Sequence, residues 1–231
     1  MRNCALAVAA GATALLLSLG FMGSGAGAQD THAMSILDAV DDGRSAFPKD
    51  ATALRRIHAY GRCVGSSEPA SLLSDYPASA GDLRTLSGTA RFSSCGGDNL
   101  RFPRRALRGI MAEYLFERHM DADGKLKHTP AKVFRSPTTS ELERMPPEVK
   151  ASIVFVEIAT CVGRANLPGV RQLLATPVAT PEERAAFAAL VPSIGNCVPA
   201  GVDLRMHRMM FRGFLAEGAY RAAATTADGA S

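Results

Sequence analysis

The sequence predicts an all-α protein of two homologous helical units, each with three main helices plus a short one and each closed by a disulfide. Three observations support this prediction. Apolar residues recur at helical spacing through most of the chain, four cysteines remain after a secretory signal, and a fourteen-residue frame occurs twice. The frame reads LRFPRRALRGIMAE at residues 100–113 and LRMHRMMFRGFLAE at residues 204–217.

The first 28 residues predict an export signal that is not part of the fold. One early charge, Arg2, precedes an apolar run that ends in small residues before Gln29. This order is typical of a secretory signal peptide, with cleavage near Ala28–Gln29 and a mature protein in the periplasm or outside the cell. A membrane anchor is the alternative, but the run contains several glycines and small residues. Cys4 precedes the apolar run, so no lipoprotein is expected.

Cleavage would leave about 203 residues, enough for one good-sized core or two small ones. The loss of Arg2 reduces the net charge from +4 to +3, a bias too weak to predict a nucleic-acid or membrane partner by itself. No later apolar run reaches the roughly 18 residues that a membrane helix needs. The absence of Trp argues against a carbohydrate-stacking groove.

The two halves of the mature chain share the same order of sequence features. Residues 62–65 read RCVG and residues 160–163 read TCVG; each is followed by a proline, a double leucine, a second cysteine and the fourteen-residue frame. The offset between the halves grows from 98 to 104 residues, which indicates short loop insertions. An internal duplication is therefore predicted. The expected organisation is a lead-in (29–46), unit 1 (47–119), a polar linker (120–145), unit 2 (146–222) and a disordered tail (223–231).

Four cysteines in an exported chain predict disulfides, and three connectivities are possible. Spacing alone does not choose among them, but a duplicated unit should close its own bridge, which gives Cys63–Cys95 and Cys161–Cys197. Loops of about 33 and 37 residues predict roughly 3.5–4 kcal/mol of stabilisation per bridge. No C-x-x-C or His/Cys cluster is present, so neither a zinc site, a redox pair nor any other cofactor is predicted.

The first helix of each unit is predicted at about 49–64 and 147–162. In the first of these, apolar residues form one stripe at three- and four-residue steps. The second is the most apolar segment of the mature chain, and its β-branched run IVFVEI leaves a strand as an alternative.

A short helix is expected around each double leucine, followed by middle helices that reach about 92 and 193. Thr180, Pro181 and Glu183 give the second of these a strong start, and Ser79 and Asp82 take the same parts in the first. The last helices are expected at about 103–119 and 202–222. Each second cysteine is expected in the loop before the last helix.

The last helices carry arginines at i, i+3 and i+7, which would lie on one helical face. The functional interpretation is an anion-binding stripe for a phosphate, a carboxylate or an acidic envelope glycan. The alternative is a solvated or salt-bridged face with Glu113 and Glu217 as local partners. The stripe consists of Arg101, Arg104, Arg108, Arg205, Arg208 and Arg212.

A glycine follows the last arginine of the frame in both halves, at Gly109 and Gly213. Glycine inside a helix costs about 1 kcal/mol relative to alanine. These two positions therefore predict the close approach of another helix.

Few other residues suggest chemistry. HMDADG at 119–124 resembles part of a calcium loop, but Pro130 stands where a bidentate glutamate is needed, so a turn is the expected structure and no metal site is predicted. No hydrolase or phosphate-loop motif is present. His58 is expected to be packed or solvated rather than catalytic. His207 aligns with Pro103, so any role of His207 would be confined to one unit. Glu157, in the apolar helix, is either an acid–base group or the partner of an arginine.

The combined pattern C-V-G…P…L-L…C…L-R-x-x-R-x-x-x-R-G-x-x-A-E resembles a group of uncharacterised exported proteins of alphaproteobacteria, over about residues 49–221. The first unit departs from it at RFPRRA (101–106), where a proline stands near the helix start. The resemblance implies export and a repeated architecture, and it implies no catalytic residue.

The expected function is a non-catalytic binding or interaction module of the cell envelope, with an anionic envelope component or a protein as partner. The alternative is a hydrolase-like enzyme with a site between the units, and a stress-related structural protein is a third possibility. A binding module predicts an arginine-lined groove between the units. An enzyme predicts converging carboxylates or histidines in a deep pocket that contains Glu157 or His207.

Overall fold

The computed structural model of the chain describes residues 47–66, 70–89, 93–96, 100, 102–121, 123–127, 133–199, 204 and 206–228. Within these residues every regular element is helical, as the sequence predicts. The helices follow in the order α2 (Ala51–Gly65), η1 (Ala70–Ser74), α3 (Ala80–Thr89), η2 (Ser93–Cys95), α4 (Arg104–His119), α5 (Thr139–Arg144), α6 (Pro147–Ala165), α7 (Leu167–Ala175), α8 (Pro181–Cys197) and α9 (Arg208–Asp228).

Capping side chains set where several helices begin. Asp50 accepts hydrogen bonds from the backbone N–H groups of Thr52 and Ala53 at the start of α2. The Thr180 hydroxyl accepts from the Glu183 N–H at the start of α8, as the sequence predicts. Such bonds satisfy N–H groups that have no partner within the helix.

The segment IVFVEI is helical, so the strand alternative is wrong for this stretch. Ile153, Val156 and Ile158 are buried at helical spacing in α6. Packing of this face against α9 overrides the β-propensity of the branched side chains.

Both predicted disulfides are confirmed. Cys63 and Cys95 have Cα atoms 5.8 Å apart, and Cys161 and Cys197 have Cα atoms 5.7 Å apart. Cys95 lies in η2, whereas Cys197 is the last residue of α8 and not in a loop as expected. Helix α8 continues past Pro192 and ends four residues later than predicted, while α3 already ends at Thr89.

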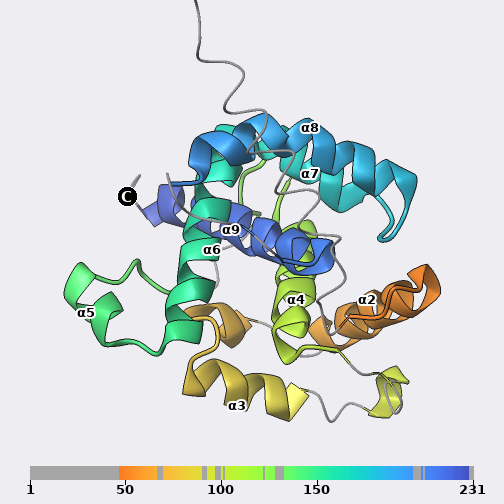
Figure 1. Cartoon of the computed structure of the whole chain (residues 1–231), viewed down its shortest axis with the longest axis horizontal. Coiled ribbons are helices and arrows are strands. Elements are labelled where there is room, and N and C mark those ends of the chain that lie inside the picture. The colour runs from red at the N-terminus through yellow and green to blue at the C-terminus, as the bar shows by residue number, and fades with distance from the viewer. Residues whose placement is uncertain are drawn as a thin grey trace, which may run out of the picture.

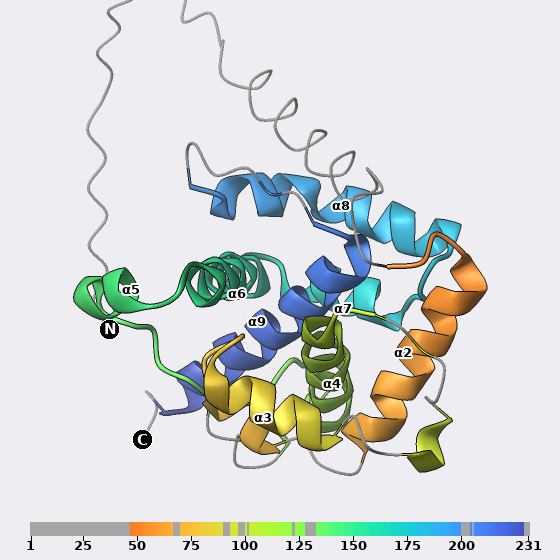
Figure 2. The same ribbon diagram turned by 60° about the horizontal axis from the view of Figure 1, so that its bottom comes forward.

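Helix α9 lies at the centre of the molecule. It runs across both α6 and α4, with α7 and α8 on one side and α2 and α3 on the other (Figure 1). Helix α4 in turn lies between α9 and α2 (Figure 2). The largest buried cluster takes residues from both halves, such as Leu115 and Phe116 of α4 with Phe211 and Leu215 of α9. The two halves therefore share a core.

Helices α4 and α9 cross at Gly109 and Gly213, which are each other's nearest neighbours. A Cβ atom on Gly109 would lie 2.7 Å from the Cα atom of Gly213, and one on Gly213 would lie 2.5 Å from the Cα atom of Gly109. These distances leave no room for a methyl group. The close approach predicted from the two glycines is present, and the approaching helix is in each case the other copy of the frame.

Two segments are more ordered than the sequence predicts. The expected linker contains α5, which begins with a capping box between Thr138 and Glu141, and a buried Phe134. The expected tail continues α9 as far as Asp228, with Ala224 buried. The predicted signal peptide and lead-in, residues 1–46, lie outside the described residues.

None of the described helices is by itself long and apolar enough to cross a membrane. Helices α6 and α7 meet the length and hydropathy requirements only when taken together, across a bend of 107°.

The crossing predicts that Gly109→Ala destabilises the protein strongly. The added methyl group meets backbone atoms, which cannot rotate away, so we expect the free energy of unfolding to fall by about 2–3 kcal/mol. Gly195→Ala in α8 is the matched control because no atom lies within 4 Å of its added Cβ. We expect that variant to be neutral or up to about 1 kcal/mol more stable. Urea denaturation measures both, and equal effects at the two glycines would contradict the close packing.

Candidate functional site between the two halves

The Arg108 guanidinium is buried and all of its N–H groups are directed at acceptors. Its Nε and Nη2 donate to the two carboxylate oxygens of Glu217, at 2.8 and 2.5 Å. Its Nη1 donates to Asp82 Oδ1 at 2.5 Å and to the Leu72 carbonyl at 2.8 Å, and Nη2 also donates to the Asp75 carbonyl at 3.1 Å. Arg108 thus binds a carboxylate of the other half and also caps η1 of its own half.

Arg212 makes the corresponding set of contacts from α9. Its Nε and Nη2 donate to the carboxylate of Glu113, at 3.0 and 2.6 Å, and its Nη1 lies 3.2 Å from Glu183 Oε1. Its remaining bonds are to acceptors at the end of α7: the carbonyl oxygens of Leu173, Leu174 and Thr176 and the Thr176 hydroxyl.

These contacts correct the two interpretations of the repeated arginines. Arg108 and Arg212 do not present their charge to an external anion, because bonds to protein oxygens occupy their donors. Glu113 and Glu217 do pair with these arginines, but not locally as the alternative expected. Each pairs with the arginine of the opposite helix, since residues five apart on one helix do not face each other. Arg104 is exposed at the start of α4, Arg208 is half-buried, and Arg101 and Arg205 lie outside the described residues.

The acidic partners Asp82 and Glu183 hold matching turns. The Asp82 carboxylate accepts from the Ala78 N–H, and the Glu183 carboxylate accepts from the Ala179 N–H, both at 2.8 Å. Ala78 and Ala179 both have positive φ values, 62° and 57°. Each acidic residue therefore links an unusual backbone conformation to the buried arginine of its own half.

Glu113 differs from Glu217 because a histidine reaches it from α2. His58 Nε2 lies 3.2 Å from Glu113 Oε1, although its alignment is not that of a good hydrogen bond. Burial alone would raise the pKa of Glu113, but the close approach of His58 Nε2, the hydrogen bonds from Arg212 and the charge of Arg212 lower it to about 2. In the corresponding cluster around Arg108, burial raises the pKa of Asp82, and the opposing charge of Arg108 does not fully cancel this effect.

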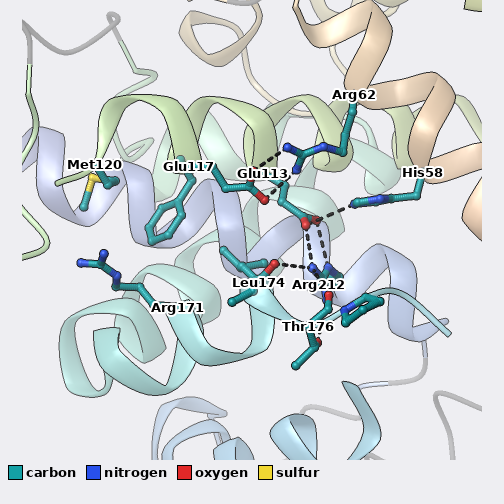
Figure 3. A pocket seen from close by; sticks show the side chains of 12 residues that line it. His58, Arg62, Glu113, Glu117, Met120, Arg171, Leu174, Thr176 and Arg212 are labelled. Atoms are coloured by element: carbon teal, nitrogen blue, oxygen red, sulfur yellow. Dashed lines mark hydrogen bonds and ion pairs between the residues drawn. The ribbon is translucent and has the colours of Figure 1, made fainter. Parts of the chain in front are cut away.

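A cleft of about 620 Å³ opens beside the Arg212–Glu113 pair. One wall is formed by α2 and α4 of the first half, and the other by α7 and the turn that follows it in the second half (Figure 3). Its lining consists of His58, Arg62, Glu113, Phe116, Glu117, Met120, Arg171, Leu174, Ala175, Thr176, Pro177 and Arg212.

The cleft combines charged and apolar surface. Arg62 donates two hydrogen bonds of 2.6 Å to Glu117 along one wall. Arg171 stands at the far end near Met120, away from the His58–Glu113–Arg212 group (Figure 3). Phe116, Met120 and Leu174 supply apolar surface between these groups. Such a lining suits a ligand that has both an apolar and a polar part.

The other residues that the sequence singled out lie outside this cleft. Glu157 bonds to Arg221 at 2.7 Å, which confirms the arginine partner. His207 stacks on Phe47 with ring centroids 4.4 Å apart, and its Nδ1 accepts from the Met209 N–H at the start of α9. Asp121 accepts from the N–H groups of Asp123 and Lys125 in a turn, as expected for HMDADG.

Sequence reasoning missed the residues that give the cleft its character. Arg62, Glu117 and Arg171 are scattered charges on three helices, and nothing in their spacing indicates a shared site. His58 was expected to be packed or solvated, yet it faces a buried carboxylate. The position of His58 beside the apolar stripe of α2 was the available signal, because α2 packs against α4.

Comparisons of the chain with protein-family models, with curated proteins and with solved structures find no match.

The depressed pKa of Glu113 predicts a specific acid sensitivity. Its folded pKa of about 2 lies below the usual 4.5, so the ionised carboxylate stabilises the fold above pH 4.5 and loses that effect as the pH falls towards 2. The raised pKa of Asp82 changes the stability with pH in the opposite sense. Because Asp82 is also present in a variant that lacks only the Glu113 carboxylate, its effect cancels when that variant is compared with wild type.

We therefore expect Glu113→Gln to cost about 3 kcal/mol at neutral pH, because it removes one partner of a buried pair. The difference from wild type should shrink as the pH falls. Urea unfolding of both proteins at about pH 6, 4 and 3 measures this difference. A difference that stays constant over this range would contradict the assignment.

Proposed function

We propose that this chain is an exported, non-catalytic binding module whose ligand site is the cleft between its two halves. The observation that carries the proposal is the lining of the cleft, in which arginines, carboxylates, a histidine and apolar side chains from both halves face one space of about 620 Å³. That volume lies within the range of small-ligand sites. Arg212 and Arg62 are paired with Glu113 and Glu117, so the three arginines and two carboxylates of the lining leave only a small net positive charge, which favours a ligand with an acidic group.

Export and duplication belong to the same proposal. Two disulfides are compatible with an oxidising compartment, and the predicted signal peptide would direct the chain to such a compartment. The matched contacts of Arg108 with Glu217 and of Arg212 with Glu113 support descent of the two halves from one unit. The resemblance to exported alphaproteobacterial proteins remains part of this proposal.

A hydrolase-like enzyme is the second candidate, favoured by one observation. The imidazole of His58 faces the carboxylate of Glu113 inside the cleft, and a carboxylate can orient a histidine for base catalysis. Against this, the one hydroxyl in the lining, Thr176, donates its proton to the Leu173 carbonyl and is not directed at His58. Glu157 and His207 are also absent from this lining. Ester hydrolysis abolished by His58→Ala would favour the enzyme.

Occlusion of the cleft tests the binding proposal. Ala175 lines the cleft and is exposed, so Ala175→Trp should fill the cleft without disturbing the core. Gln172→Trp on the same helix is the matched control because Gln172 is exposed but outside the lining. The probe is a library of small carboxylates, amines and tripeptides, monitored by the amide NMR spectrum of the protein. We expect binders whose shifts cluster on α2, α4 and α7 and disappear only in Ala175→Trp. A library without such binders would contradict the proposal.

Export is tested by expression of the full chain in a Gram-negative host. We expect a periplasmic product that begins at Gln29 and has no free thiol, because its cysteines are paired as Cys63–Cys95 and Cys161–Cys197. N-terminal sequencing and thiol labelling measure the two properties. A chain that keeps residues 1–28 and stays in the membrane fraction would instead support an anchor.

A further inference from the structure

The chain packs one of its own segments against Leu73, Tyr76 and Arg221, and the surface that these three residues form is here called the occupied groove. Phe134, in the segment between α4 and α5, is buried between η1 and α9. Its N–H donates to the Leu73 carbonyl at 2.8 Å, and its ring meets the Tyr76 ring edge-on, with centroids 5.3 Å apart. The Arg221 guanidinium lies over the Phe134 ring at 4.4 Å and donates from Nε to the Phe134 carbonyl at 3.2 Å.

The alignment of the two halves relates this groove to the open cleft. The double leucines align Leu73 with Leu174, and the same register aligns Tyr76 with Pro177. The R-G-x-x-A-E frame, extended by four residues, aligns Glu117 with Arg221. Leu174, Pro177 and Glu117 all line the cleft. Each of the three residues that hold Phe134 in one groove thus has its counterpart in the wall of the other.

We infer that the open cleft binds an extended peptide segment with an aromatic anchor, in the way that the other groove holds residues 133–136. This inference rests on the proposed function and names the ligand class of that same site. The aromatic side chain would lie on Phe116, Met120 and Leu174, at the position that corresponds to the Phe134 ring. The Leu174 carbonyl accepts one hydrogen bond from Arg212 and keeps a lone pair for a peptide N–H.

The charges of the two grooves predict different preferences next to the anchor. In the occupied groove Arg221 and Glu157 both bond to the Ser136 hydroxyl. In the cleft, Arg221 is replaced by Glu117, which is already paired with Arg62. Arg171 adds a positive charge at a position that aligns with Ala70. Acidic residues on either side of the anchor therefore fit the cleft better than the basic Arg135 of the chain's own segment.

Two synthetic peptides test the anchor. The first is AEVFESP, acetylated and amidated, and the second has alanine in place of its phenylalanine. We expect the first to bind the full mature protein with micromolar affinity, and the second to bind at least ten-fold more weakly, because the ring supplies most of the buried apolar area. Ala175→Trp should abolish binding of the first peptide and Gln172→Trp should leave it unchanged. Fluorescence anisotropy of labelled peptides gives the affinities.

A double variant tests the relation between the two grooves independently. Arg62 and Glu117 align with Thr160 and Arg221, and both side chains are about one-third exposed, at 35% and 37%. Arg62→Thr combined with Glu117→Arg makes the cleft wall resemble that of the occupied groove. We expect this variant to bind KVFRSP, the sequence of residues 132–137, at least five-fold more tightly than wild type does. No gain would overturn the relation between the grooves.

The outcomes separate this inference from the function on which it rests. Small carboxylates or amines that bind in the cleft, together with no binding of AEVFESP, would overturn the peptide inference and leave the binding module intact. Peptide binding that Ala175→Trp does not affect would also overturn it, because the peptide would then bind elsewhere. No cleft binder of any kind would remove both proposals.

Discussion

The reciprocal pairing of two buried arginines with two buried glutamates is the interaction on which this fold depends. Removing a guanidinium or a carboxylate from water is costly, and it is tolerated only when donors and acceptors are satisfied. Neither half meets this condition alone, because Arg108 needs Glu217 and Arg212 needs Glu113. The Gly109–Gly213 contact brings α4 and α9 close enough for both pairs to form. The arginines also cap η1 and α7, so the crossing positions α7 beside the cleft and η1 beside Phe134.

The two halves make the same central contacts but differ around them, and the differences make the cleft. His58 aligns with the buried Val156, and Arg62 aligns with Thr160. In the occupied groove, the corresponding space is filled by Phe134, which lies under the Arg221 guanidinium. The chain itself therefore closes this groove. In the first half Glu117 replaces Arg221 and pairs with Arg62, and the space stays open to a ligand. The shared core thus holds one filled and one open version of a similar groove.

Much of the fold could be predicted because its determinants are local or repeated. Helical periodicity and the Thr180 cap act over short distances, and the repeated order of cysteines and frame indicated both disulfides. The partners of Arg108 and Arg212 could not be predicted, because the frame places a glutamate near each arginine without showing that the two copies cross. The burial of Phe134 was missed because a single aromatic residue in a polar stretch carries no periodic signal. The cleft itself arises from tertiary packing, and scattered charges such as Arg171 reveal no such arrangement in advance.

The exchange of partners between α4 and α9 has an evolutionary consequence. If the proposed duplication is correct, a single ancestral copy had no second frame in its own chain to satisfy its arginine. It would have found that frame in another molecule, as an isologous homodimer with two equivalent grooves. On that hypothesis, gene fusion would have made the subunit interface intramolecular and freed the grooves from symmetry. One groove would then hold the connecting segment that fusion created, and the other would be left to specialise.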